Sequence, residues 1–399
     1  MLSKKVDQIT PSFTIGISSK VSLLRKNGET IIDLSIGEPD FTTPLAGKSK
    51  ALEAIHQNMT KYDLVPGLLP LREAICQKLQ MENHVAYLPA EIVASSGAKN
   101  AITNALMAVL DPGDEVIVPS PYWTSYPEMI KLCHGIPVII NTDKKNDYKL
   151  KAEQLEAMVT SKTKLLLINN PSNPTGSVYS KDELVPLVNF CIKNNILILA
   201  DEIYEKIHFD ETFTSIPSIS NEAKNMTILV NGFSKSAAMT GWRLGYTASN
   251  AKIAASISTI QGHLTSHPST IAQWAGLGAL ESGDEEMQHM VKIYKDRRDC
   301  LLPLLNGLPN VDYVYPQGAF YLFLDLSHYK YAFTNEASFS IAFCDQFLSE
   351  YKVAVVPGIA FGNDDCIRIS YATKIEWVID GLDKLKNFLS TLEIEQQTT

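Results

Sequence analysis

Short apolar runs alternate with helical patterns through the middle of the chain. Three runs, Glu115–Val118, Lys164–Ile168 and Ile196–Ala200, are bounded by Gly, Pro, Asn or Asp. Between the last two runs, residues 181–194 carry apolar side chains at helical spacing. Strands that are apolar throughout are buried on both faces, as in a parallel sheet covered by helices. The pattern therefore predicts an α/β fold with a mostly parallel sheet flanked by helices.

The C-terminal third has a different pattern. Gly318–Asp325, Val353–Gly358 and Cys366–Tyr371 each have the composition of a strand, and residues 337–350 have that of a helix. These elements predict a smaller α+β domain. We expect the boundary between the two parts to lie near the long helical stretch around residues 285–300.

Composition and charge narrow the function classes. The chain has 399 residues, with 35 basic and 44 acidic side chains and a net charge of −9, which disfavours nucleic acid or an anionic membrane as a partner. The six cysteines lack C-x-x-C spacing, which argues against a metal site or a disulfide framework. No apolar window is long enough for a signal peptide or a membrane span. We expect a cytoplasmic protein.

Candidate chemistry gathers just beyond the ends of the apolar runs. Lys235 follows the buried run Thr227–Val230, and Arg243 follows eight residues later. A lysine amine can form a Schiff base with an aldehyde, and an arginine can bind a phosphate through two nitrogens. Four further segments follow strand ends: the small residues Ala94–Asn100 at a helix start, the aromatic loop Pro119–Pro127, the Asn-Pro cluster Ile168–Gly176, and Asp201 with Tyr204.

Each of these segments also has a plain structural interpretation. Ala94–Asn100 fits a simple Ser-Gly turn, the aromatic and Asn-Pro segments fit ordinary loops, Asp201 fits a helix N-cap, and Tyr204 fits core packing. Their common position favours one site, because ligands of open α/β sheets bind at the carboxyl ends of the strands. A carboxylate at the end of a buried strand also needs a cationic partner.

With these residues the chain resembles the class I aminotransferases, the aspartate aminotransferase-like group of fold-type I pyridoxal-phosphate enzymes. The resemblance extends from Leu34–Asp40 to Arg368–Tyr371, and its most specific blocks are Asn169–Gly176 and Ser234–Tyr246. It implies pyridoxal 5'-phosphate as the cofactor. It also implies a large cofactor-binding domain at residues 47–286, and a small domain of residues 1–46 and 287–399 that includes an N-terminal arm.

The resemblance implies roles for individual residues. Lys235 resembles the Schiff-base lysine, Asp201 resembles the partner of the pyridine nitrogen, and Tyr204 completes the catalytic set. The implied cofactor contacts are Asn173 and Tyr204 at the ring hydroxyl, Trp123 stacked on the ring, Lys99 nearby, and Gly97, Ala98, Ser234 and Arg243 at the phosphate. Arg368 resembles the arginine that binds the substrate α-carboxylate, with Gly37, Trp123 and Asn173 in the same pocket.

The resemblance also implies a homodimer with shared sites. Tyr62 resembles a tyrosine that reaches the phosphate of the neighbouring subunit, and Thr265 and Ser266 lie where the family contributes across the interface. Lys99 matches a lysine that contacts the side-chain carboxylate of aspartate or glutamate in one branch of the family.

The expected function is transfer of an amino group from an L-amino acid, aspartate, to a 2-oxo acid, 2-oxoglutarate, in two half-reactions. Phe13 and His267 depart from the aspartate-selective pattern. They leave an aromatic or broad-specificity aminotransferase open as an alternative. A C–S lyase shares the same scaffold and remains a second alternative.

Overall fold

A computed structural model of the chain describes residues 3, 6–210, 212–334 and 336–398, with side chains described up to residue 393. Its largest sheet has seven strands in the order β2-β8-β7-β6-β5-β3-β4. The bounds are β2 (Ile92–Ser95), β3 (Glu115–Ser120), β4 (Ile136–Asn141), β5 (Thr163–Asn169), β6 (Leu197–Asp201), β7 (Thr227–Gly232) and β8 (Gly245–Ala248). Strands β4, β3, β5, β6 and β7 pair in parallel, and β8 is antiparallel to both β7 and β2. The predicted fold class is confirmed.

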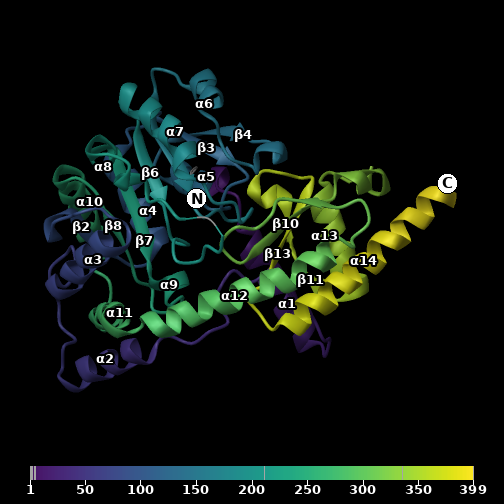
Figure 1. Ribbon diagram of the computed structural model, residues 1–399, viewed down its shortest axis with the longest axis horizontal. Helices are drawn as coiled ribbons and strands as arrows, with labels where there is room; N and C mark the ends of the chain where they lie inside the picture. The colour runs from purple at the N-terminus through teal and green to yellow at the C-terminus, as the bar shows by residue number, and fades with distance from the viewer. Residues whose placement is uncertain (1–2, 4–5, 211, 335, 399) are drawn as a thin grey trace.

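Alternate side chains of the central strands enter two apolar clusters. Leu166 and Ile198 belong to a cluster with side chains of α3 (Leu69–Glu82), α6 (Ala152–Met158), α7 (Lys181–Lys193), α8 (Asn221–Met226) and α11 (Thr270–Ser282). Leu165 and Leu199 belong to a second cluster with α4 (Ala98–Val109), α5 (Tyr126–Leu132) and α10 (Ala251–Leu264). Figure 1 shows helices on both sides of the sheet. Burial of both faces explains why consecutive residues within the predicted runs, such as Leu165–Ile168, are apolar.

A smaller sheet domain follows in the C-terminal third. Strands β9 (Asp312–Tyr313), β10 (Tyr321–Asp325), β12 (Val356–Pro357) and β13 (Cys366–Ser370) form an antiparallel sheet in the order β12-β13-β10-β9. Helices α13 (Phe339–Tyr351) and α14 (Ile375–Thr398) contribute to its apolar cluster. Strand β1 (Ile32–Asp33) pairs in parallel with β11 (Val353–Ala354), so an N-terminal segment joins this part of the molecule.

One prediction in this region is wrong. The run Val353–Gly358 was expected to be a single strand, whereas it divides into β11 and β12. The division has a clear cause, because β11 pairs with β1 while β12 pairs with β13 in a different sheet. Val355 lies between the two strands and is buried.

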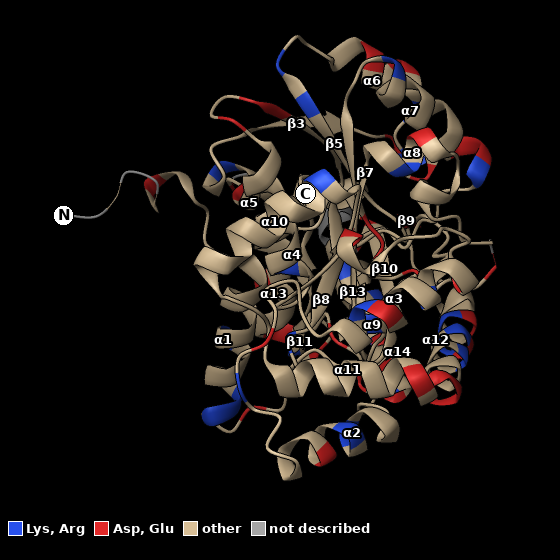
Figure 2. Cartoon of the chain, turned by 90° about the vertical axis from the view of Figure 1, so that its left-hand side faces the viewer, with Lys and Arg blue, Asp and Glu red and all other residues tan. Residues whose placement is uncertain are grey.

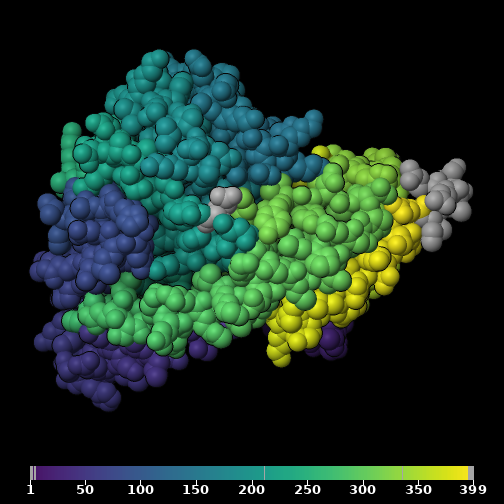
Figure 3. Space-filling model, viewed as in Figure 1, coloured from purple at the N-terminus to yellow at the C-terminus, as the bar shows by residue number. Residues whose placement is uncertain are grey.

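The two sheets are bridged by the long helix α12 (Asp284–Leu305), which corresponds to the helical stretch expected around residues 285–300. Figures 1 and 3 show it running from the larger sheet domain to the smaller one. Basic and acidic residues intermingle along it in Figure 2. Remaining elements are α1 (Phe13–Lys26), α2 (Leu45–His56), α9 (Phe233–Ser236) and the 3-10 helices η1 (Val6–Gln8), η2 (Pro89–Glu91), η3 (Lys144–Asn146), η4 (Ile216–Ser218), η5 (Ser327–Phe333) and η6 (Gly358–Phe361). None of the described helices has the length and apolar character needed to span a membrane.

Candidate active site

A cleft of about 950 Å³ lies beside the carboxyl ends of β5, β6 and β7, where the parallel sheet meets β10, β13 and the N-terminal segment. Eleven of the residues predicted from the sequence line it: Gly37, Ala98, Lys99, Trp123, Asn173, Asp201, Tyr204, Ser234, Lys235, Arg243 and Arg368. Gly97 lies against Arg243 at its edge. Residues from seven separate parts of the chain are therefore brought together, most of them at the ends of strands, where ligands of open α/β sheets bind.

Lys235 lies in the single turn of α9, directly after β7. Its amine donates a hydrogen bond to the Gly37 carbonyl and lies 5.8 Å from the ring centre of Tyr204 and 5.7 Å from that of Phe320. Burial, with the nearby positive charge of Arg368, lowers the pKa of the Lys235 amine to about 8. An appreciable neutral fraction is therefore present near neutral pH, and a neutral amine can act as a nucleophile or a base.

Asp201 is the last residue of β6 and is buried. Its carboxylate accepts hydrogen bonds from the Tyr126 hydroxyl at 2.6 Å and from the Ile203 backbone N–H at 3.2 Å, both of which are uncharged donors. Burial raises the pKa of Asp201 to about 6, although both hydrogen bonds oppose the increase. A buried carboxylate held by neutral partners is a favourable place for a cationic ligand atom.

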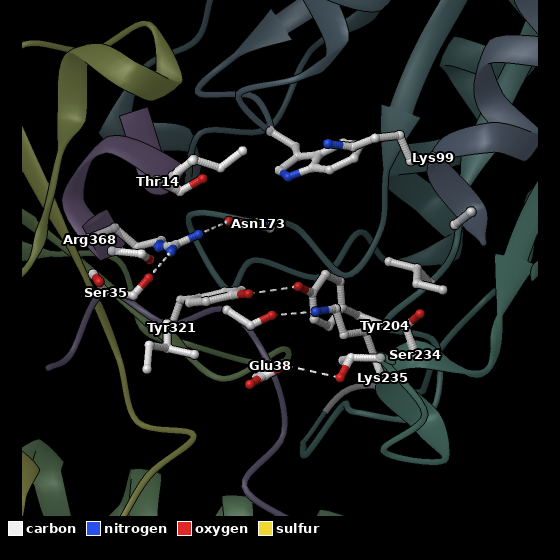
Figure 4. Close-up of a pocket in the computed structure, with 18 of the residues that line it drawn as sticks. Thr14, Ser35, Glu38, Lys99, Asn173, Tyr204, Ser234, Lys235, Tyr321 and Arg368 are labelled. Atoms are coloured by element: carbon white, nitrogen blue, oxygen red, sulfur yellow. Dashed lines mark hydrogen bonds between the residues drawn. The ribbon is translucent and has the colours of Figure 1, made fainter. Parts of the chain in front are cut away.

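Arg368 enters the cleft from β13 and is buried. Nη1 donates to Asn173 Oδ1 at 3.0 Å, Nη2 donates to the Ser35 carbonyl at 2.9 Å, and the guanidinium lies 4.3 Å from the ring centre of Tyr321 (Figure 4). The Tyr321 hydroxyl in turn shares a 2.7 Å hydrogen bond with Tyr204. Arg368 Nε is buried without a hydrogen-bond partner, so the guanidinium has a donor that the described protein groups do not use.

The N-terminus of α4 forms the opposite wall. Gly97 occupies its N-cap with φ of 88°, and no side chain caps the helix. A Cβ at Gly97 would lie 2.5 Å from Arg243 Nη2, so the close approach of the guanidinium requires glycine here. Unpaired backbone N–H groups at a helix start beside an arginine form an anion-binding arrangement. Lys99, one residue into α4, places its amine 4.9 Å from the ring centre of Trp123.

Comparison with known proteins decides the family. The family model for aminotransferase class I and II matches residues 29–381. An aspartate aminotransferase from Bacillus sp. (strain YM-2) is 41% identical over 98% of this chain and 99% of the relative. An aspartate/prephenate aminotransferase from Nitrosomonas europaea is 39% identical over 98% of this chain and 100% of the relative. The chain belongs to the class I and II aminotransferases.

Solved structures agree with this aminotransferase assignment. The crystal structure of the aspartate aminotransferase from Rhizobium meliloti matches with a TM-score of 0.92 and 36% identity, covering 98% of this chain and 99% of that one. The Thermus thermophilus aspartate aminotransferase with maleate matches with a TM-score of 0.90 and 36% identity, covering 97% of this chain and 99% of that one. The protein is a pyridoxal-phosphate-dependent transaminase with the fold of these enzymes.

The cleft of this aminotransferase fits pyridoxal phosphate. The cofactor carries an aldehyde, a basic ring nitrogen and a phosphate, and the cleft offers a complementary group for each. Lys235 supplies an amine with a lowered pKa, Asp201 supplies a buried carboxylate, and the α4 N-terminus with Arg243 supplies a cationic cradle.

Other predicted residues lie outside the cleft. Tyr62 is 90% exposed, and its ring lies edge-on to that of His267 at 5.8 Å. Thr265 is exposed and Ser266 is half-buried, both just after α10. The residues lining the cleft within this chain do not include Phe13 or His267. Phe13 instead packs near Phe361 in the smaller sheet domain, so this aromatic ring gives no support to an aromatic substrate.

Sequence reasoning missed several residues that shape the aminotransferase cleft. Tyr126 was noted only as part of an aromatic loop, and Tyr321 only as part of a strand, yet each hydrogen-bonds a predicted site residue. One face of α1 also lines the cleft, through Thr14, Ile15, Ser18, Ser19, Ser22, Leu23 and Lys26. Thr14, Ser18, Ser22 and Lys26 recur every four residues, a helical spacing that could have indicated a common face.

Proposed function

We propose that this protein is an aspartate aminotransferase that transfers the amino group of L-aspartate to 2-oxoglutarate. One observation carries the proposal: Arg368 and Lys99 reach the same cleft from opposite sides, with Lys235 also on its wall (Figure 4). Two cations suit a substrate with two carboxylates. The names of the relatives support the choice, and the Thermus enzyme was solved with maleate, which is itself a dicarboxylate.

We assign the cofactor contacts as follows. Asp201 would pair with the ring nitrogen, and Asn173 and Tyr204 would hydrogen-bond the ring hydroxyl. Trp123 would stack on the ring, while Gly97, Ala98, Ser234 and Arg243 would hold the phosphate, with Lys99 nearby. Bound pyridoxal phosphate supplies an aldehyde that captures amines and a ring that withdraws electrons from the substrate carbon. Asp201 favours this withdrawal, because its negative charge keeps the ring nitrogen protonated.

Arg368 fixes the substrate through its α-carboxylate, and Gly37 closes the same end of the pocket. The planar guanidinium can donate two parallel hydrogen bonds, which orients the carboxylate as well as binding it. Lys235 then acts as a base and an acid, moving a proton at its Nζ atom. Its pKa of about 8 suits this role, since the proton is neither held nor released too strongly near neutral pH.

We further propose that the active unit is a homodimer. The exposure of Tyr62 supports this, because a tyrosine on the surface of one chain can complete the phosphate site of its neighbour. Thr265 and Ser266 are assigned to the same interface. We also propose that residues 47–286 form the large domain, and that residues 1–46 and 287–399 form the small one.

Product analysis tests the function. The protein, saturated with pyridoxal phosphate, is given L-aspartate and 2-oxoglutarate, and oxaloacetate is measured through NADH oxidation by malate dehydrogenase. Oxaloacetate and glutamate in equal amounts support the proposal. Pyruvate and ammonia from a cysteine-derived substrate, without transfer, would indicate a C–S lyase instead.

A panel of amino donors completes this test. A rate with phenylalanine or tyrosine above that with aspartate would favour the aromatic alternative. Prephenate belongs in the acceptor panel, because relatives from Nitrosomonas europaea and Aquifex aeolicus carry aspartate/prephenate names.

A further inference from the structure

The segment Ser35–Glu38 is tied to three residues of the cleft. Arg368 Nη2 donates to the Ser35 carbonyl at 2.9 Å, and the Lys235 amine donates to the Gly37 carbonyl. The Thr240 hydroxyl donates to Glu38 Oε2 at 2.9 Å. The first two anchors are the groups assigned to the substrate and the cofactor. The third anchor, through Glu38, has no role in the function described above.

Glu38 has an unusual position for an exposed glutamate. It lines the cleft, and Thr240, which holds it, lies five residues after Lys235 on the same loop. The Thr240 carbonyl accepts a hydrogen bond from Arg243 Nη1 at 2.8 Å. One threonine therefore joins the Glu38 carboxylate to the arginine assigned to the phosphate, and both contacts lie on the loop that carries Lys235.

Glu38 affects the balance of charge around the Lys235 amine. Arg368 and Arg243 are the cations that face the Lys235 amine, Glu38 and Asp201 are the carboxylates, and Tyr204 presents its ring. Asp201 is already held by two hydrogen-bond donors and is assigned to the ring nitrogen. Glu38 is thus the carboxylate that remains to offset the two arginines at the lysine.

We propose that Glu38 is a positioning residue for Lys235. The Thr240 hydroxyl fixes the Glu38 side chain, which keeps a negative charge near the Lys235 amine. The same anchor holds the neighbouring residue Gly37 where its carbonyl accepts a hydrogen bond from that amine. Removal of this charge lowers the pKa of Lys235 below its value of about 8, because the two arginines are then less well balanced. The proposal rests on the proposed function only for its kinetic readout.

The direct test titrates Lys235 in the full-length, cofactor-free protein. Trace acetic anhydride labels the amine from about pH 6 to about pH 10, a range that covers its titration, and mass spectrometry of the Lys235 peptide gives the midpoint. Glu38→Gln keeps an oxygen that can accept from Thr240 but removes the charge. We expect its midpoint to fall by on the order of half a pH unit. Glu38→Asp keeps the charge, and we expect it to restore most of the difference.

Glu153→Gln is the matched control, since Glu153 is exposed on α6 and outside the cleft. Equal midpoints for Glu38→Gln and Glu153→Gln would overturn the proposal. In the holoenzyme, the acid limb of the kcat profile for aspartate, which reports the substrate complex in which Lys235 is a free amine, is expected to move down with the midpoint in Glu38→Gln. If Glu38→Gln shifted the labelling midpoint of Lys235 but left the acid limb of the pH profile unchanged, Glu38 would not act on the reaction. That result would also overturn the proposal.

Thr240→Val tests the anchor while leaving every charge in place. We expect kcat to fall a few-fold with KM nearly unchanged, and Thr240→Ser to restore it. Wild-type kcat in Thr240→Val would refute the hydroxyl anchor. Failure of the proposed function has a different signature: the wild type would produce no oxaloacetate from aspartate, whereas the labelling midpoints would still decide the role of Glu38.

Discussion

Replacement of Lys235 by methionine is expected to stabilise the cofactor-free protein at neutral pH. The folded state lowers the pKa of this amine from 10.5 to about 8, so folding opposes its charge. A difference of about 2.5 in pKa corresponds to about 3 kcal/mol. Because Lys235 is only partly buried and water reaches the cleft, we expect a gain of about 2 kcal/mol. Methionine has a similar length and carries no charge to desolvate.

The pH dependence follows from the sign of the shift. Below about pH 8 the amine is protonated in both states, so the full cost of its charge destabilises the folded wild type. Between about pH 8 and pH 10.5 only the unfolded chain keeps the proton, and the wild type gains stability as the pH rises. The difference in unfolding free energy between Lys235→Met and the wild type should therefore shrink over this range.

Urea denaturation of both cofactor-free proteins measures this difference, at a fixed protein concentration, at pH 7 and near pH 10. Glu153→Gln, which is exposed and outside the cleft, controls for general effects of substitution. A variant that is less stable than the wild type at pH 7 would refute the reasoning. So would a difference that stays constant with pH, because it would show that the charge of Lys235 is not what folding opposes.

The remaining predictions concern turnover. Asp201→Asn should lower kcat about 10- to 1000-fold, since an opposite charge shifts the pKa of a neighbouring nitrogen by about 1 to 3; a near-normal kcat would contradict the assigned pairing. Arg368→Lys should lower kcat/KM about 10- to 100-fold for every amino donor, because the charge remains but the paired hydrogen bonds are lost; a loss confined to one donor would count against it. Lys99→Gln should lower kcat/KM about tenfold for aspartate and glutamate but not for alanine, as steady-state assays with the three donors would measure; an equal loss for alanine would assign Lys99 to the cofactor alone.

The fold could be predicted because its local signals agree. The run Leu165–Ile168 is apolar at every position and lies in β5, with alternate side chains buried on opposite faces. The parallel direction of β5 could also be inferred from this apolar run, because a run buried on both faces is typical of a parallel sheet covered by helices on both sides. Residues 181–194 predict a helix for a different reason, because their apolar side chains recur at helical spacing. In the structure, Ser180 and Glu183 also form a capping box where α7 begins. Local chemistry therefore marked both the type and the start of these elements.

The site could be predicted only in part, because strand ends give positions along the sheet edge but not contacts across the cleft. Lys235 and Asp201 follow neighbouring strands, so their proximity could be inferred from order alone. Tyr126 gave no such signal. Its hydroxyl reaches Asp201 from a helix 75 residues earlier, and a buried tyrosine in an aromatic loop has the composition of any core residue. The pairing of Tyr321 with Tyr204 is hidden in the same way, across 117 residues.

The cleft gathers groups whose charges the folded chain alone leaves poorly compensated. Burial raises the pKa of Asp201 to about 6 and lowers that of Lys235 to about 8, and Arg368 Nε is buried without a partner. Each of these three groups would be compensated by a different ligand atom: Asp201 by a cation, Lys235 by an electrophilic carbon and Arg368 by a carboxylate. Binding of cofactor and substrate therefore offsets the unfavourable free energy of holding these groups in the folded protein. This explains why residues that weaken the cofactor-free protein are the same ones that we assign to the cofactor and to the substrate α-carboxylate.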